Sequence, residues 1–389
     1  MPERKMEHVA RVARLSQKMF RYHLLSRLTP LSPRTVIICV TMRCNARCIM
    51  CNIWRKRADS ELTLEEWGKI MEDPIFESIE NLEITGGEPF ISPNLVTLVE
   101  LYIQRMPQLA NLSVVSNGIA GDVVVAKTKE LAMRCRERGV RFTVSISLDG
   151  IGELHELIRG TEACFDKTTK VLLELKRIES IFNFRVFAGS MVLRDNLSRT
   201  EEMRKWFRGH GIPFTFQIVG FNDSYVRNRD LKERVDFGAE QLPDLQRFLT
   251  SEASKKGWHL LSAYYWRDLL AMYRDNNRRT TPCPALKDQF AIDSYGDVFY
   301  CLHEKLERLS PSKSVSAIYY SPENLKRRGE MWRRKCGCCT SACVVDEAIK
   351  CEPWIYLWFR LTGQPWYGIR TGLLSQIKKA LRLPSLFAG

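Results

Sequence analysis

The sequence predicts an α/β fold with a parallel sheet and helical crossovers, followed by a smaller cysteine-rich region. Between residues 36 and 220, short apolar, β-branched runs alternate with helical stretches six times, and this alternation is typical of parallel sheets. Between residues 283 and 351 the chain places seven of its 13 cysteines. Its 389 residues are enough for one large domain and a smaller one.

Composition excludes several classes of protein. Hydrophobic residues make up 45% and charged residues 27%, which is typical of a globular protein, and no run of 18 apolar residues predicts a transmembrane helix. No signal peptide is evident, so the many cysteines indicate a reducing compartment, and we expect the cytoplasm. Of the net charge of +14, residues 1–34 carry +6 and residues 353–389 carry +5. The middle is nearly neutral, which argues against nucleic-acid binding.

The two ends of the chain are basic and amphipathic. Residues 1–34 predict a basic helix over 4–28, and residues 353–389 form an aromatic, basic tail. Such segments lie on an anionic membrane surface or pack on the body of the protein, and both alternatives stay open. Membrane contact would make the protein peripheral to a membrane.

Residues 35–220 carry the alternating pattern, and residues 221–282 predict a helical bridge to the cysteine-rich region at 283–352. The strands are expected at 36–41, 82–85, 112–116, 141–148, 185–193 and 213–219, and the helices at 63–73, 93–106, 123–138, 166–179 and 197–210. The form Thr63-Leu-Glu-Glu66 predicts a capping box at the first of these helices. Sites in such folds form where the strands end.

Three cysteines follow the first strand as C-x3-C-x2-C, at Cys44, Cys48 and Cys51. Three thiolates leave one iron of a four-iron cube open to a small molecule. A structural zinc ion wants a fourth ligand, which the sequence does not place nearby. A disulfide framework suits short secreted chains. Buried unligated thiols are the remaining alternative.

Polar residues and glycines follow the next three strands. Thr85-Gly-Gly-Glu-Pro89 has two glycines that permit positive φ and close approach of a ligand, and the Glu88 carboxylate is suited to accept hydrogen bonds from an ammonium group. Ser116-Asn-Gly118 and Ser147-Leu-Asp-Gly150 end the third and fourth strands. Taken alone, such residues are more often turn formers than ligands.

Together these motifs resemble the radical S-adenosylmethionine (SAM) superfamily. The resemblance implies a partial, TIM-like (β/α)6 barrel in which Cys44, Cys48 and Cys51 hold a [4Fe-4S] cluster. It implies that SAM binds the open iron and is cleaved by the reduced cluster, and that the resulting 5′-deoxyadenosyl radical abstracts hydrogen from an unactivated carbon. The cofactor contacts that it implies are Met50, Gly86, Gly87, Glu88, Pro89, Ser116, Asn117, Ser147, Arg159 and Val192.

Within this set the resemblance assigns roles. Glu88 and its turn would bind the SAM amino group, and Ser147 with Arg159 would bind the carboxylate and ribose region. Met50 stands where the family commonly has an aromatic residue near adenine, and Val192 lies in a strand that often contacts adenine. Asp149 would face the substrate as the catalytic residue.

The C-terminal cysteines resemble the SPASM/twitch extension of the same superfamily. Cys283, Gly296 and Cys301 match its C-x(9–15)-G-x4-C opening, with a predicted hairpin of 290–292 and 298–300. The remaining cysteines proposed as ligands of an auxiliary [4Fe-4S] cluster are Cys336, Cys339 and Cys343. The match is incomplete, because Val345 stands where the pattern has cysteine, and Cys338 and Cys351 are extra. The number of auxiliary clusters stays open, and four thiolates also suit zinc.

These observations predict a radical SAM oxidoreductase or maturase that carries out an oxidation or forms a C–C or C–S bond. A peptide is the substrate class common in the SPASM/twitch group, the basic aromatic ends favour a lipid-like substrate, and a small metabolite is the third alternative. A flavodoxin or ferredoxin is the expected electron donor. The non-enzymatic alternative is an iron–sulfur or zinc scaffold with a vestigial barrel.

Overall fold

The computed structural model describes residues 16–55, 61–254, 260–275, 279, 283, 285–334, 339–341, 351 and 358. The chain divides into two compact units. The larger combines residues 32–239 and 288–328. The smaller contains the described residues before 32, between 240 and 287, and after 328.

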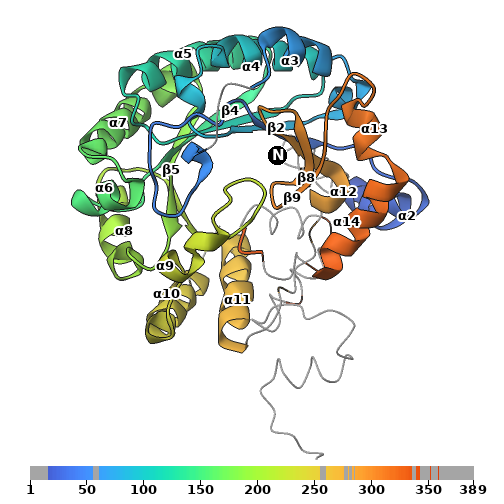
Figure 1. The fold of residues 1–389 in the computed structure, drawn as a ribbon. Helices are drawn as coiled ribbons and strands as arrows, with labels where there is room; N and C mark the ends of the chain where they lie inside the picture. The colour runs from blue at the N-terminus through green and yellow to red at the C-terminus, as the bar shows by residue number, and fades with distance from the viewer. Residues whose placement is uncertain are drawn as a thin grey trace, which may run out of the picture. The chain divides into compact units, whose positions relative to one another are not determined.

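The larger unit is built on six parallel strands, each paired with its neighbour in sequence (Figure 1). Their bounds are β1 Thr35–Cys39, β2 Asn81–Thr85, β3 Asn111–Ser116, β4 Arg141–Ser147, β5 Arg185–Val192 and β6 Phe214–Ile218. In β1 four of five residues are buried, as expected for a strand covered on both faces. The predicted partial (β/α)6 barrel is confirmed.

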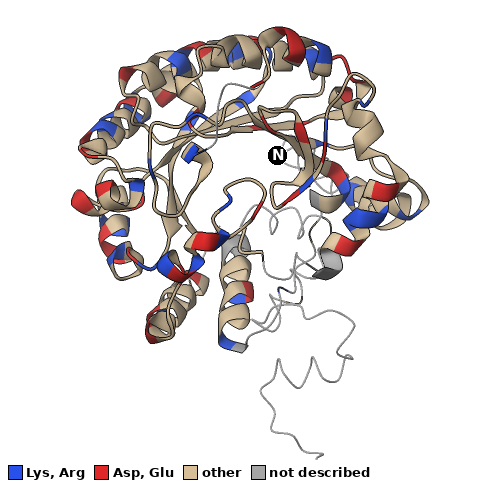
Figure 2. Ribbon diagram, viewed as in Figure 1, with Lys and Arg blue, Asp and Glu red and all other residues tan. Residues whose placement is uncertain are grey.

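Helices follow the strands and form the outer layer of this barrel (Figure 1). Their bounds are α3 Leu64–Ile70, α4 Leu95–Arg105, α5 Asp122–Glu137, α6 Glu153–Arg159, α7 Cys164–Phe182 and α8 Thr200–Gly209. Figure 2 shows Lys and Arg interspersed with Asp and Glu along this layer. The capping box is confirmed, because the Thr63 side chain accepts from the Glu66 N–H and the Glu66 carboxylate accepts from the Thr63 N–H.

The predicted hairpin is also confirmed, and it extends the barrel sheet. β7 (Gln289–Ile292) pairs in parallel with β1 and antiparallel with β8 (Asp297–Cys301). A third strand, β9 (Glu304–Arg308), was not predicted. The order β6-β5-β4-β3-β2-β1-β7-β8-β9 therefore places β1 inside the sheet rather than at its edge. Three further helices flank these strands in sequence. The helix α9 (Lys232–Val235) precedes β7, and α13 (Val315–Tyr319) and α14 (Pro322–Arg334) follow β9.

The smaller unit is mainly helical where it is described. Its helices include a π-helical turn at Arg21–Leu25, α2 Ser26–Leu28, α10 Leu242–Ala253, α11 Leu260–Asp275 and α12 Ala285–Asp288. Tyr22 is buried, with the Lys287 ammonium 3.9 Å from its ring centroid. At Tyr22 the N-terminal helix therefore packs on protein.

The segments that carry most of the terminal charge, residues 1–15 and 359–389, lie outside the described residues. Contact of the ends with a membrane stays a prediction. Among the described helices, none has the length and apolar character needed to cross a membrane.

Candidate active site

A cavity of about 350 Å³ lies where the parallel strands end, inside the larger unit. All six strands or the segments that follow them contribute to its lining, as the parallel topology predicts. The predicted residues on its wall are Cys44, Cys48, Met50, Cys51, Gly86, Gly87, Glu88, Ser116, Asn117, Ser147, Asp149 and Arg159. Residues from distant parts of the sequence are thus gathered around one space.

The three cysteines lie on an irregular loop after β1, and each is a half-buried free thiol. Burial raises the pKa of Cys44 to about 11 and that of Cys51 to about 12, and it also raises the pKa of Cys48. The N–H groups of Ala46 and Ile53 lie 3.5 Å from the sulfurs of Cys44 and Cys51. Such thiols lose their protons when a metal binds, so metal binding and proton release are coupled here.

The chemistry of this donor set fits an iron–sulfur cluster better than a single ion. Among the described residues, no three His, Cys, Asp or Glu side chains are grouped closely enough to hold one metal ion. In a four-iron cluster each thiolate binds a different iron, so the three sulfurs lie further apart than the ligands of one zinc ion. Cys44, Cys48 and Cys51 line one shared cavity without forming a group that could hold one ion.

The glycines of the turn after β2 are required by the chain itself. A Cβ atom on Gly86, which has a φ of +143°, would lie 2.2 Å from the Thr41 carbonyl oxygen, and one on Gly87 would lie 2.0 Å from that of Arg43. The Gly87 N–H donates to the Thr41 carbonyl at 2.7 Å. The sequence predicted that a ligand would approach these glycines closely. In the structure, the backbone that leads into the cysteine loop makes this close approach.

Glu88 joins this turn to the end of β3. Its side chain is 1% exposed; Oε1 accepts from the Phe90 N–H at 3.1 Å and the Ser116 hydroxyl at 2.9 Å. Among the described residues, Oε2 accepts from the Asn117 N–H alone, at 2.6 Å. Burial raises the pKa of Glu88 to about 7, against the lowering effect of these hydrogen bonds. Oε2, with one donor, keeps capacity for a second.

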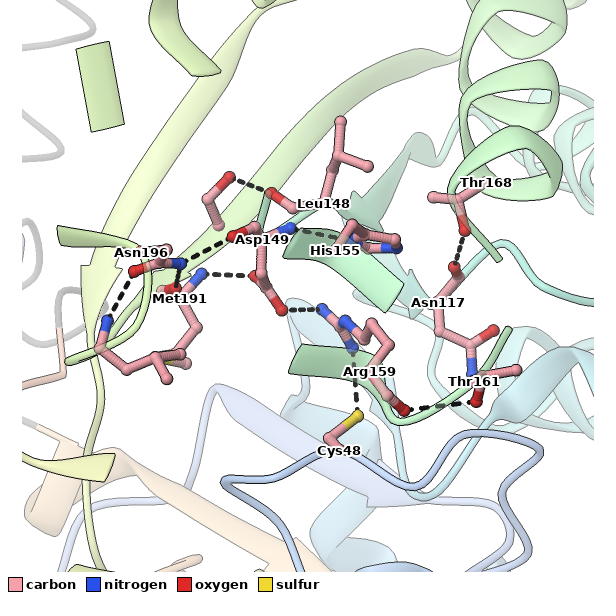
Figure 3. Close-up of polar contacts among 12 residues, drawn as sticks. Cys48, Asn117, Leu148, Asp149, His155, Arg159, Thr161, Thr168, Met191 and Asn196 are labelled. Carbon is pink, nitrogen blue, oxygen red and sulfur yellow. Dashed lines mark hydrogen bonds and ion pairs between the residues drawn. The ribbon is translucent and has the colours of Figure 1, made fainter. Parts of the chain in front are cut away.

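Asn117 in turn connects β3 to the cysteine loop. Its Nδ2 donates to Asn45 Oδ1 at 2.7 Å and lies 3.9 Å from the Cys44 sulfur. Its carbonyl accepts from the Thr168 hydroxyl at 2.8 Å (Figure 3). Ser116 and Asn117 therefore act in this structure by holding Glu88 and the loop, which the sequence did not predict.

Arg159, at the end of α6, lies between Cys48 and Asp149 (Figure 3). Its Nη2 is 2.7 Å from Asp149 Oδ2, and its Nη1 is 3.7 Å from the Cys48 sulfur. The carbonyls of Ile158 and Arg159 also accept the Ile49 and Arg47 N–H groups, both at 2.9 Å. The end of α6 thus fixes the middle of the cysteine loop.

Asp149, predicted to face the substrate, is paired with Arg159. It lies on the cavity wall, but its side chain is fully buried, and Oδ1 accepts from the Met191 N–H at 2.8 Å while Oδ2 pairs with Arg159. Its backbone is held as well, by His155 Nδ1 and by Asn196 Nδ2 (Figure 3). Burial raises the pKa of Asp149 in spite of Arg159. A carboxylate engaged in this way holds Arg159 in place, and its contact with a substrate stays a prediction.

Two further predicted contacts fall elsewhere. Val192 is fully buried and does not line the cavity, whereas its neighbour Met191 does, because successive side chains of a strand point to opposite faces. Pro89 is also buried away from the cavity wall and begins a 3-10 turn. Both residues shape the backbone beside the cavity.

The segment after β6 was missed by sequence reasoning. The Tyr225 hydroxyl donates to the Gly86 carbonyl at 2.8 Å, and Asn228 Nδ2 donates to the Met50 carbonyl at 2.8 Å. The Asn52 N–H donates to the Val226 carbonyl at 3.0 Å. No motif marks these residues; the available signal is their place directly after the last strand, at the end of the barrel where sites form.

Of the C-terminal cysteines proposed as ligands, Cys283, Cys301 and Cys339 are described, and the side chain of each is half-buried. Cys301 ends β8 in the larger unit, whereas Cys283 and Cys339 belong to the smaller. Cys336 and Cys343 lie outside the described residues, as does Cys338. The auxiliary ligand set therefore stays a prediction.

The curated proteins that resemble this chain match it over only part of their length. The chain is 25% identical over 265 residues to the antilisterial bacteriocin subtilosin biosynthesis protein AlbA of Bacillus subtilis, which covers 67% of this chain and 53% of that protein. It is 34% identical over 99 residues to a probable GTP 3′,8-cyclase of Methanopyrus kandleri, covering 24% and 31%. The chain thus spans about half of the first relative and about a third of the second.

Solved structures share the fold at low identity. Streptococcus suis SuiB bound to the precursor peptide SuiA matches with a TM-score of 0.54 and 16% identity, covering 83% of this chain and 74% of that one. Native anSMEcpe with bound AdoMet matches with a TM-score of 0.55 and 14% identity, covering 85% and 100%.

A family model matches the part of the chain that contains most of the residues lining the cavity. Residues 38–207 match the model described as the radical SAM superfamily. They include the cysteine loop, the glycine turn and Arg159. The chain therefore carries a radical SAM domain over these residues, and the superfamily that the model describes uses a [4Fe-4S] cluster and SAM.

Proposed function

We propose that this chain is a radical SAM enzyme that modifies a peptide by hydrogen abstraction, as an oxidation or as C–C or C–S bond formation. The observation that carries the proposal is the single cavity in which the three cysteines, the Glu88 turn and Arg159 converge. A bound [4Fe-4S] cluster with SAM supplies reductive cleavage of the sulfonium and a radical that takes hydrogen from an unactivated carbon. The electron comes from a flavodoxin or ferredoxin.

The chain's own residues bind and orient SAM. Cys44, Cys48 and Cys51 hold the cluster, and Glu88 Oε2 accepts a hydrogen bond from the SAM ammonium, because it has one donor in the structure. Arg159 presents its guanidinium to the SAM carboxylate while Asp149 keeps it in place. An arginine in this position also offsets the negative charge of a thiolate-bound cluster.

Other groups shape the cavity around the cofactor. Ser147 and Met50 lie on its wall and are proposed to contact the ribose and adenine ends of SAM. Met191 takes the adenine contact predicted for Val192, since it is the member of the pair that lines the cavity. The segment that contains Tyr225 and Asn228 limits the access of water by closing over the cysteine loop.

The peptide class is supported by what the relatives' names state. AlbA is a bacteriocin biosynthesis protein, and SuiB and anSMEcpe are solved with bound peptides. The lipid-like alternative rests on terminal segments outside the described residues. The proposal places the enzyme in the cytoplasm.

Isotope transfer separates the substrate classes. The source organism is grown on deuterated medium, and its peptide, lipid and small-metabolite fractions are each added to the reconstituted protein with unlabelled SAM and dithionite. We expect deuterium in 5′-deoxyadenosine with the peptide fraction, because abstraction carries substrate hydrogen into that product. Deuterium from the lipid or metabolite fraction alone contradicts the peptide class, and no 5′-deoxyadenosine in any arm supports the scaffold alternative.

A further inference from the structure

A buried arginine contacts the backbone of Cys339 in the smaller unit and lies four residues before Cys283 in sequence, far from the cysteine loop of the larger unit. Arg279 is 8% exposed, and its Nη1 donates to the carbonyls of Cys339 at 3.3 Å and Ser341 at 3.1 Å. Its Nε lies 3.7 Å from the buried carboxylate of Asp268 on α11. Its Nη2 is buried without a hydrogen-bond partner among the described residues.

The segment that Arg279 holds is fixed at three successive carbonyls. Arg279 binds those of residues 339 and 341, and the Tyr265 hydroxyl of α11 donates to the Thr340 carbonyl at 2.7 Å. The Ser341 N–H lies 3.4 Å from the Cys339 sulfur. A backbone N–H directed at a cysteine sulfur is one of the contacts that tune iron–sulfur ligands.

The pairing of Arg279 leaves a donor available for an anionic group. The Asp268 carboxylate lies 3.7 Å from Nε, and Nη2 has no acceptor among the described residues. A buried guanidinium with an unused donor is costly unless an acceptor or anion is supplied. Thiolates bound to metal supply that charge.

We propose that Arg279 is a positioning residue that stabilises an anionic [4Fe-4S] cluster in the smaller unit, bound through Cys283 and Cys339, and that it raises the reduction potential of this cluster. This rests on the proposed radical SAM function and on the auxiliary cluster that the C-terminal cysteines predict. Asp268 acts in the opposite direction, since it offsets part of the arginine's charge. The reduced cluster carries one more negative charge, so a nearby cation favours reduction.

The test uses the full chain with Cys44, Cys48 and Cys51 replaced by alanine, so that the SAM-binding cluster is absent. After anaerobic reconstitution, iron and zinc are counted and the midpoint potential is measured by EPR-monitored titration. Arg279→Gln is expected to hold less iron or to shift the midpoint to a more negative potential. Asp268→Asn is expected to shift it to a more positive potential, and Arg279→Lys to restore part of what Gln loses.

The matched control is Arg204→Gln, which removes another buried arginine, 4% exposed and paired with Glu201 in the larger unit. It should leave iron content and midpoint unchanged. The proposal is overturned if Arg279→Gln has the same iron content and the same midpoint potential as the triple-alanine background. It is also overturned if the background binds zinc or no metal. If Arg279→Gln fails to fold, an unshifted midpoint in Asp268→Asn overturns it. Failure here leaves the SAM site untouched, since that site is tested separately by 5′-deoxyadenosine formation.

Discussion

Single buried groups hold the candidate active site in place, and Arg159 is the clearest case. Its guanidinium joins Cys48 to Asp149, and its carbonyl binds the Arg47 N–H. An exposed ion pair contributes little, but breaking a buried pair leaves an uncompensated charge. The stability of the site therefore depends on both members of the Arg159–Asp149 pair.

Replacing Asp149 by Asn should lower the free energy of unfolding of the metal-free protein by about 3 kcal/mol, because Arg159 is left without its buried counter-charge. Urea denaturation measures the change. Glu201→Gln removes the partner of Arg204, but Glu201 is 64% exposed, so the loss there should stay below about 1 kcal/mol. Equal losses in the two variants would show that burial of the pair is not what matters.

Glu88 makes stability depend on pH. Its pKa rises from 4.5 to about 7 through burial. A carboxyl whose pKa is raised by folding contributes stability that is fully present below its unfolded pKa and lost as pH rises through the folded one. As the pH rises from 4.5 to 7, the free energy of unfolding of the wild type should therefore fall by about 3 kcal/mol relative to that of Glu88→Gln.

Urea denaturation of both metal-free proteins across this pH range measures that difference. Glu88→Gln serves as the baseline for the wild type, because glutamine keeps the side-chain shape but does not titrate. Parallel stability profiles for the two proteins would rule out a Glu88 that is buried and neutral at low pH.

At the scale of elements, the cysteine loop is irregular and takes its shape from three neighbours. The turn after β2 packs on the backbone of Thr41 and Arg43, the end of α6 binds two loop N–H groups, and the segment after β6 binds Met50 and Asn52. The loop should therefore respond to changes made in these neighbours.

Gly86→Ala tests the first neighbour. The added Cβ would lie 2.2 Å from the Thr41 carbonyl at a φ of +143°, so we expect a loss of about 3 kcal/mol or more in unfolding free energy and less iron bound. Gly121 also has a positive φ, +59°, but open space around its Cβ. Gly121→Ala should cost only about 1 kcal/mol, and a similar cost in both variants would contradict the role of close packing.

At the scale of the whole molecule, local patterns predicted most of the barrel. The six parallel strands lie within two residues of their expected bounds, because apolar runs and turn residues are local signals. The pairing of β7 with β1 was not predicted, since it depends on contacts distant in sequence. The strand β9 pairs with the neighbouring β8, and it was missed because its mostly charged sequence contains no apolar run. The helix α6 was also missed, because its seven residues follow a glycine turn that reads as a loop.

The features of the site likewise divide into those that a local pattern predicted and those that it did not. The cysteine spacing and the Thr85–Pro89 turn are contiguous, so the sequence identified them. The burial of Asp149, the hydrogen bond from Tyr225 to Gly86 and the contact of Arg279 with residues 339 and 341 join positions far apart in the chain. Such contacts follow from the packed fold rather than from any local pattern.

The measurement that tests the central claim most directly is 5′-deoxyadenosine formed from SAM and dithionite by the anaerobically reconstituted protein. Wild type and Cys135→Ala, which removes a buried thiol of α5 outside the cavity lining, should both form it. The triple variant with Cys44, Cys48 and Cys51 replaced by Ala should form none. Product from the triple variant, or no product from wild type, would contradict the claim that these three cysteines hold the cluster that cleaves SAM.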